Sequence, residues 1–160
     1  MNNGEFYLAD AIEVIDEILA GGGEFRMFPK GTSMLPLIVQ GKDSVVLKRN
    51  TDVPAKKHDI AFYRRTSGQF VLHRVMRIEK DGTYTMCGDN QFDLEKGIKR
   101  EQIIGYVSCI YKGDKKRENK ALGYRIYVFF WCIMPIRRLI RFPRKVFYAL
   151  LTRVSRMRKK

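Results

Sequence analysis

The sequence predicts a mainly β protein with a helix at its N-terminus and a basic, amphipathic helical tail at its C-terminus. Between residues 25 and 112, short β-branched and aromatic runs alternate with Gly, Asp and Asn turn signals, which is typical of a small antiparallel, barrel-like domain. Residues 5–20 instead place apolar side chains at helical spacing. Beyond residue 120, long apolar runs are interleaved with Arg and Lys. At 160 residues, the chain suits one domain and a tail.

Segment 1–24 is expected to form an N-terminal helix and a glycine linker. Apolar residues recur at helical spacing at Leu8, Ile12, Ile15 and Leu19. Three consecutive glycines at 21–23 then end the helix, because glycine is the residue most often found just past a helix C-terminus.

Segment 25–112 is predicted to form the β domain. The expected strands cover residues 25–28, 44–48, 60–63, 70–78, 84–87 and 103–111. Lys80-Asp81-Gly82 predicts a hairpin turn between the fourth and fifth of these strands.

Charge separates the β domain from the C-terminal part of the chain. Residues 1–114 carry 16 basic and 16 acidic side chains, whereas residues 115–160 carry 15 basic side chains and only Glu118, so the net charge of +14 lies beyond residue 114. We therefore expect a charged linker at 113–120 and a tail at 121–160 that binds an anionic partner.

The tail is predicted to lie in an anionic membrane interface. Its apolar run 126–136 would span about 16 Å as a helix, which is too short to cross a hydrocarbon core of about 30 Å. Large apolar residues alternating with Arg are typical of interfacial helices, whose positive charge favours the cytoplasmic leaflet. The alternatives are a helix pair packed on the β domain and a nucleic-acid arm. We expect no nucleic-acid partner, because such arms seldom carry so many large apolar residues.

Three separated segments supply a hydroxyl, an imidazole and a carboxylate in chain order. They are Gly31-Thr32-Ser33-Met34-Leu35-Pro36, Leu72-His73-Arg74-Val75 and Gly88-Asp89-Asn90. A serine becomes a nucleophile when a base takes its proton and another group orients that base. Gly31 permits an unusual backbone angle before Ser33, and Pro36 stiffens the chain after it, so a tight turn is expected at Ser33.

These segments resemble the serine peptidases of the signal peptidase I and LexA-like superfamily. Further similar segments occur in the family's order over residues 25–110: Gly41-Lys42-Asp43-Ser44-Val45-Val46, His58-Asp59-Ile60-Ala61-Phe62 and Ile103-Ile104-Gly105-Tyr106-Val107. The family's base is most often a lysine. His73 resembles instead the histidine branch of archaeal, endoplasmic-reticulum and spore-former signal peptidases.

The resemblance implies a small β peptidase domain and a serine endopeptidase that cleaves a signal or leader peptide from a precursor protein. Ser33 would be the nucleophile, His73 the general base and Asp89 the residue that orients the imidazole. Asp93 resembles a second acidic residue, and Glu95 competes with it for that role. A further set would shape the turn and the oxyanion site: Gly31, Thr32, Met34 and Pro36. The family's N-terminal membrane anchor has no counterpart before Ser33. A peripheral position on the cytoplasmic face of the cell membrane is therefore expected.

Two other functions stay open at this point. Ala20-Gly21 resembles the Ala-Gly bond that LexA-like repressors cleave in themselves, and a peptidase fold can also serve as a non-catalytic, membrane-associated binding module. No metal or other cofactor is expected, since Cys87, Cys109 and Cys132 are widely spaced and form no zinc-binding pattern.

Overall fold

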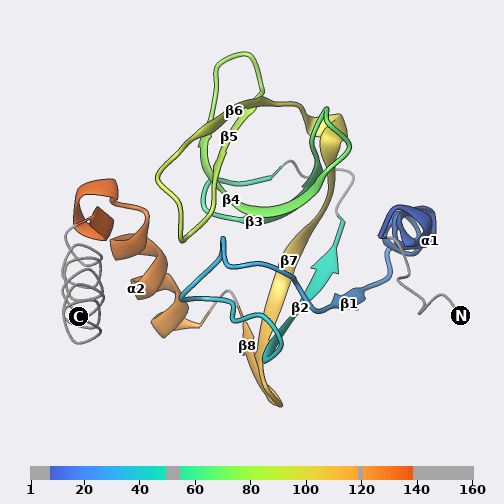
Figure 1. Ribbon diagram of the computed structural model, residues 1–160, viewed down its shortest axis with the longest axis horizontal. Helices are drawn as coiled ribbons and strands as arrows, with labels where there is room; N and C mark the ends of the chain where they lie inside the picture. Colours follow the sequence, from blue (N-terminus) through green and yellow to red (C-terminus); the bar gives the residue numbers. More distant parts are fainter. Residues whose placement is uncertain (1–7, 50–54, 119–120, 139–160) are drawn as a thin grey trace, which may run out of the picture.

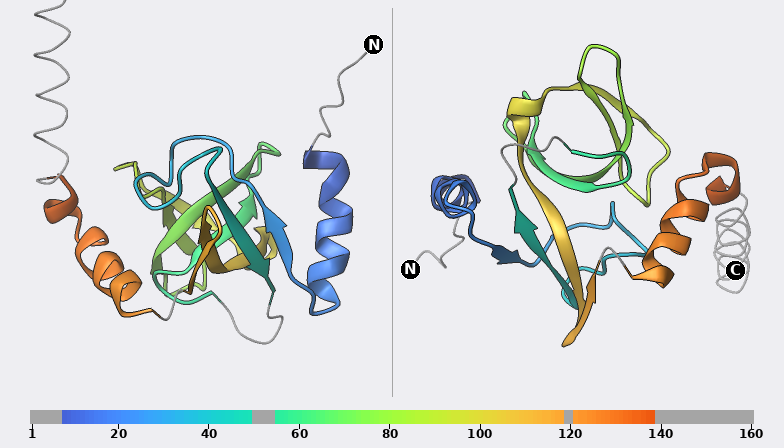
Figure 2. Two further views of the ribbon diagram at one scale, coloured as in Figure 1. Left: turned by 90° about the horizontal axis from the view of Figure 1, so that it is seen from below. Right: turned by 180° about the vertical axis from the view of Figure 1, so that it is seen from behind.

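A computed structural model describes residues 8–49, 55–118 and 121–138 of the chain. It is mainly antiparallel β, with one helix before the sheet, α1 (Leu8–Ala20), and helical segments after it that begin with α2 (Leu122–Trp131). The strands are β1 (Phe25–Met27), β2 (Asp43–Lys48), β3 (Ile60–Arg64), β4 (Phe70–Ile78), β5 (Tyr84–Cys87), β6 (Glu95–Ile98), β7 (Ile103–Lys112) and β8 (Lys115–Glu118). The two helices lie at opposite ends of the sheet (Figures 1 and 2).

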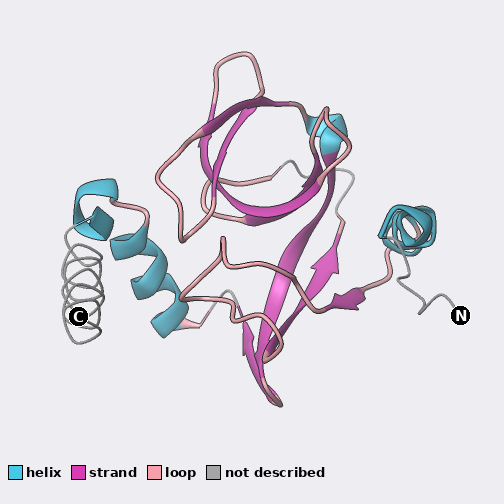
Figure 3. Ribbon diagram, viewed as in Figure 1, coloured by secondary structure: helices cyan, strands magenta, loops and turns pink. Residues whose placement is uncertain are grey.

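The strands form one coiled but open sheet. Their order is β1-β2-β7-β3-β4-β5-β6, with β8 paired to β7, and every pairing is antiparallel. The strands β3, β4, β5 and β6, at the top of the view in Figures 1 and 3, curl strongly. The terminal strands β1 and β6 do not pair with one another, so the expected barrel is not closed.

Two apolar clusters fill the two faces of the coiled sheet. Ile60 and Phe62 of β3 belong to the first cluster, while Ala61 and Tyr63 belong to the second. This alternation follows from the two-residue period of a strand. Both faces are buried, which explains why β3 has a continuous apolar sequence instead of an alternating one.

Helix α1 is anchored to the sheet at a glycine. Ile15 and Leu19 are each 1% exposed and belong to the first cluster. A Cβ built on Gly105 of β7 would lie 3.0 Å from Leu19 Cδ1 and 3.1 Å from the Lys48 carbonyl oxygen. The absence of a side chain at Gly105 therefore lets the helix and β2 approach β7 closely.

Two short strands differ from the sequence expectation. The segment 113–120, expected to be a charged linker, includes β8, which pairs with β7 over Cys109–Lys112. The sequence does not predict β6, because Glu95-Lys96-Gly97-Ile98 lacks an alternating apolar pattern. Both strands lie at the margin of the sheet, where pairing with one neighbour can hold a polar strand.

The C-terminal tail is described only in its first part. Residues 121–138 begin with α2 and continue to a buried Arg137, while the basic segment 139–160 of the predicted tail lies outside the described residues. Within the part that the structure describes, no helix is long and apolar enough to span a membrane.

Candidate active site

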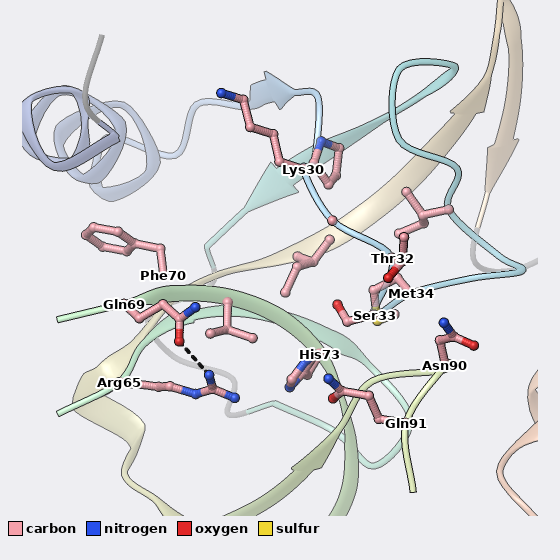
Figure 4. Close-up of a pocket in the computed structure, with 15 residues that line it drawn as sticks. Lys30, Thr32, Ser33, Met34, Arg65, Gln69, Phe70, His73, Asn90 and Gln91 are labelled. Carbon is pink, nitrogen blue, oxygen red and sulfur yellow. Dashed lines mark hydrogen bonds between the residues drawn. The ribbon is translucent and has the colours of Figure 1, made fainter. Parts of the chain in front are cut away.

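Ser33 and His73 line the same pocket although they are far apart in the sequence. The pocket has a volume of about 420 Å³ and lies between the loop that joins β1 to β2 and the first half of β4. Ser33 comes from the loop and His73 from the strand (Figure 4). No hydrogen bond between the two side chains occurs among the described residues. Catalytic hydrogen bonds are often long before substrate binds.

The loop holds Ser33 by a glycine turn and by apolar anchors. Gly31 has a φ of +94°, a conformation that side-chain-bearing residues rarely adopt, and its N–H donates to Gln40 Oε1 at 2.6 Å. Beyond the serine, Met34 and Ile38 are 4% and 2% exposed and insert into the first apolar cluster. The expected tight turn at Ser33 is present, with Leu35 N–H donating to the Thr32 carbonyl at 3.2 Å.

His73 is almost completely buried, at 3% exposed, in the middle of β4. Its Nδ1 lies 3.2 Å from the Tyr63 hydroxyl, and that hydroxyl donates to Glu95 Oε2 at 2.8 Å. Arg65 fixes the same carboxylate with two further bonds, from Nε at 2.8 Å and from Nη2 at 2.6 Å. The imidazole is therefore connected through Tyr63 to an acid that is itself held in place.

The geometry assigns the tautomer of His73. A tyrosine hydroxyl has one proton, and here that proton points to Glu95, so the hydroxyl oxygen accepts a hydrogen bond from Nδ1–H of His73. In a neutral imidazole with Nδ1 protonated, Nε2 carries the lone pair. Nε2 is then the nitrogen able to accept a proton from a hydroxyl in the pocket.

Burial keeps this imidazole neutral. Burial, and after it the positive charge of Arg65, lower the pKa of His73 to about 4, against the opposing effects of Glu95 and Asp89. Burial also acts on Glu95, but the hydrogen bonds from Arg65 and Tyr63 outweigh it and hold the pKa of that carboxyl below its usual range. At neutral pH the site thus contains an uncharged base beside an ionised carboxylate.

Asp89, which the sequence places beside the imidazole, binds an arginine instead. Its two carboxylate oxygens accept hydrogen bonds from Arg74 Nε at 2.8 Å and Nη2 at 2.7 Å, and the Tyr127 hydroxyl donates to the same carboxylate at 3.0 Å. Asp89 and Arg74 are both fully buried. With its oxygens occupied in this way, Asp89 makes no hydrogen bond to His73, and the expectation that it orients the imidazole directly is corrected.

The turn that contains Asp89 lies against the backbone of Ser33. Asn90 N–H donates to the Ser33 carbonyl at 2.6 Å, and a Cβ built on Gly88 would lie 2.7 Å from the same oxygen. The turn of residues 88–90 therefore packs directly against the backbone of Ser33. Asp93, the expected second acid, is exposed and does not line the pocket.

Side chains from the C-terminal segment hold this turn from its other side. Trp131 Nε1 donates to the Asp89 carbonyl at 2.9 Å, and Arg137 Nη1 donates to the Gly88 carbonyl at 3.0 Å. Arg137 is 1% exposed, and its Nε has no hydrogen-bond partner among the described residues. The tail segment thus forms part of the support of the site.

The backbone beside Ser33 offers a candidate oxyanion donor. Among the described residues the Ser33 N–H makes no hydrogen bond, so it can donate to a negatively charged oxygen formed next to the hydroxyl. Thr32 also lines the pocket. Cys87 is buried, and burial raises the pKa of its thiol, so it is protonated at neutral pH. The described residues contain no cluster of side chains that could hold a metal ion.

Sequence reasoning overlooked Tyr63 and Arg65 and named Glu95 only as a rival to Asp93. These residues come from β3, the loop after it and β6, which meet at His73 because the sheet coils. No local motif marks them. The Ala20-Gly21 bond, considered as a self-cleavage site, lies at the end of α1, where Gly21 N–H donates to the Glu17 carbonyl, outside the pocket of Ser33.

No protein-family model matches the chain, and searches of curated proteins and of solved structures returned no match.

Proposed function

We propose that the protein is a serine endopeptidase that cleaves a signal or leader peptide from a precursor, with a fold and mechanism similar to those of the signal peptidase I and LexA-like superfamily. The observation that carries the proposal is the state of His73. His73 and Ser33 line the same pocket, and a buried, neutral imidazole whose Nδ1 proton is held by Tyr63 has its lone pair on Nε2. That is the arrangement a general base needs.

In the proposed reaction, Nε2 of His73 removes the proton of the Ser33 hydroxyl as the oxygen attacks the peptide carbonyl carbon. The carbonyl oxygen becomes negatively charged and accepts a hydrogen bond from the Ser33 N–H. When the C–N bond breaks, the imidazolium gives its proton to the leaving amine. Water, deprotonated by the same imidazole, then hydrolyses the acyl-enzyme and restores Ser33.

The backbone of β4 supports a peptide substrate. Residues 70–73 pair with β3 on one side, while β5 pairs only from Arg74 onward, so the other edge of this stretch has no strand partner within the described chain. Gln69, Phe70, Val71 and Leu72 line the pocket together with His73. An extended segment of a precursor can add to this edge as a short strand, with its scissile bond placed at Ser33.

Cleavage of host precursors tests the proposal. Wild type and Ser33→Ala are each co-expressed with the host's exported and small-peptide proteins, and new N-termini are identified by mass spectrometry. We expect a set of termini that is present with wild type and absent with Ser33→Ala. Ser108→Ala is a matched control, because Ser108 lies on β7 and does not line the pocket. Identical termini with wild type and Ser33→Ala would favour the non-catalytic binding module.

A further inference from the structure

A second pocket lies between the segment that begins with α2 and the strands β4, β5 and β6. It has a volume of about 440 Å³. Its charged side chains are all basic: Lys57, Arg77 and Lys96. No Asp or Glu lines it, and none of these three residues forms an ion pair within the described chain. The pocket is therefore an uncompensated positive site.

The other side of this pocket is apolar and continuous with the outer face of α2. Leu94, Phe129 and Ile133 line the pocket and are 44%, 64% and 36% exposed. The outer face of α2 adds Leu122, Ile126 and Phe130, at 71%, 50% and 49% exposed. Half of the exposed large apolar side chains of the described residues thus fall between residues 122 and 133. Single exposed apolar residues are ordinary, whereas a contiguous group marks an interaction surface.

The inner face of α2 is fully engaged with the protein. Val128 and Trp131 are each 8% exposed, and Tyr124 and Tyr127 donate or accept hydrogen bonds with Arg74 and Asp89. Helix α2 therefore has a fixed orientation, with its outer apolar face toward solvent. It lies at the margin of the molecule, where a flat partner can reach it (Figures 1 and 2).

We propose that the outer face of α2 and the basic pocket form a docking surface for an anionic phospholipid bilayer. Lys57, Arg77 and Lys96 would contact the lipid phosphates, while Phe129, Phe130 and Ile126 insert among the upper acyl chains. Charge complementarity favours an anionic bilayer, because basic residues beside large apolar residues suit an anionic membrane interface. Each basic residue near such a surface contributes about 1 kcal/mol, which is about fivefold in binding. The basic sequence beyond residue 114 adds to the same attraction.

This surface is separate from the pocket of Ser33 and does not depend on the proposed peptidase activity. It also refines the sequence expectation. The sequence predicts that the tail at 121–160 lies in an anionic membrane interface, whereas the inferred surface combines α2 with residues of the β domain. A membrane-bound precursor would then be presented next to the turn that supports Ser33.

Flotation of the full chain with lipid vesicles tests the inference. We expect binding to vesicles that contain phosphatidylglycerol and weak binding to vesicles of phosphatidylcholine alone. The pocket variant, Lys57→Gln/Arg77→Gln/Lys96→Gln, should bind these vesicles about tenfold or more weakly than wild type. The control variant, Lys42→Gln/Lys80→Gln/Lys99→Gln, removes the same charge from exposed positions outside the pocket and should bind almost as well as wild type.

A second variant keeps the test independent of charge. Phe129→Ser/Phe130→Ser removes two exposed rings without changing the buried face of α2 and should also weaken binding. Circular dichroism would verify that each variant is folded. Failure of wild type to bind anionic vesicles would overturn the inference. Equal losses in the pocket and control triple variants would overturn it as well, because they would assign binding to net charge alone. The inference would also be overturned if the pocket variant and the Phe129→Ser/Phe130→Ser variant both bound the vesicles as tightly as wild type does.

Discussion

The Tyr63 hydroxyl lies 3.2 Å from Nδ1 of His73 and donates its own hydrogen bond to Glu95. This relationship determines which imidazole nitrogen is free, and it replaces the aspartate that the sequence placed in that role. Because Tyr63 is buried and its pKa is raised, first by burial and then by its hydrogen bond to Glu95, the hydroxyl keeps its proton across the working pH range.

Removal of that hydroxyl should impair the base more than it impairs the fold. Tyr63→Phe leaves Nδ1–H of His73 without its acceptor and permits the tautomer with a protonated Nε2, which cannot take the Ser33 proton. We expect the rate of Ser33 labelling by a fluorophosphonate to fall by about tenfold or more. This is part of the roughly 10²–10⁴-fold rate increase that general-base catalysis provides. Tyr84→Phe is a matched control, since Tyr84 is buried in the same cluster but does not line the pocket. Equal labelling rates in the two variants would contradict the role of Tyr63.

Activity should fall at an unusually low pH on the acid side of its pH profile. Activity requires neutral His73, whose pKa is lowered to about 4, so kcat/KM should fall only as the pH drops through about 4 and stay level from there toward neutrality. An unperturbed histidine would give a limb near 6.5. Glu95→Gln removes a charge that raises the pKa of His73, and the limb of this variant should move to still lower pH. Labelling of Ser33 measured against pH checks both positions, and a limb at 6.5 in wild type would show that His73 is not held neutral by burial.

The strands that form the site's framework could be predicted from the sequence, but the contacts within the site could not. β3, β4 and β5 have strong apolar patterns, and the turn at Ser33 follows from Gly31 and its apolar anchors. The pairing of Asp89 with Arg74 depends instead on β4 presenting the arginine beneath the 88–90 turn, one residue after the histidine. Adjacent strand residues point to opposite faces, so the side chain next to the turn is that of Arg74.

Loss of one partner in the Arg74–Asp89 pair should destabilise the whole protein. Asp89→Asn leaves a fully buried guanidinium without its carboxylate, and such changes cost about 3–5 kcal/mol. The double variant Arg74→Met/Asp89→Leu removes both charges and should recover part of that loss in the free energy of unfolding measured in urea. Asp93→Asn, an exposed carboxylate outside the pocket, should change stability by less than about 0.5 kcal/mol. A stable Asp89→Asn protein would contradict this structural role.

The contact between the 88–90 turn and Ser33 leads to a prediction about a single methyl group. Gly88→Ala places a Cβ 2.7 Å from the Ser33 carbonyl oxygen, closer than Cβ atoms ordinarily come to a backbone oxygen, and 2.9 Å from Gln91 Oε1, which a side-chain rotation can move away. Either the turn or the Ser33 backbone must move, and a misplacement of a reacting group by about 1 Å can lower the rate about 10²-fold. Gly123→Ala is the matched control, because a Cβ at Gly123 on α2 meets no atom within 4 Å. Ser33 labelling should therefore be strongly reduced in Gly88→Ala and unchanged in Gly123→Ala. Wild-type labelling in Gly88→Ala would mean that the turn yields without disturbing Ser33, and the 88–90 turn would then not position the nucleophile.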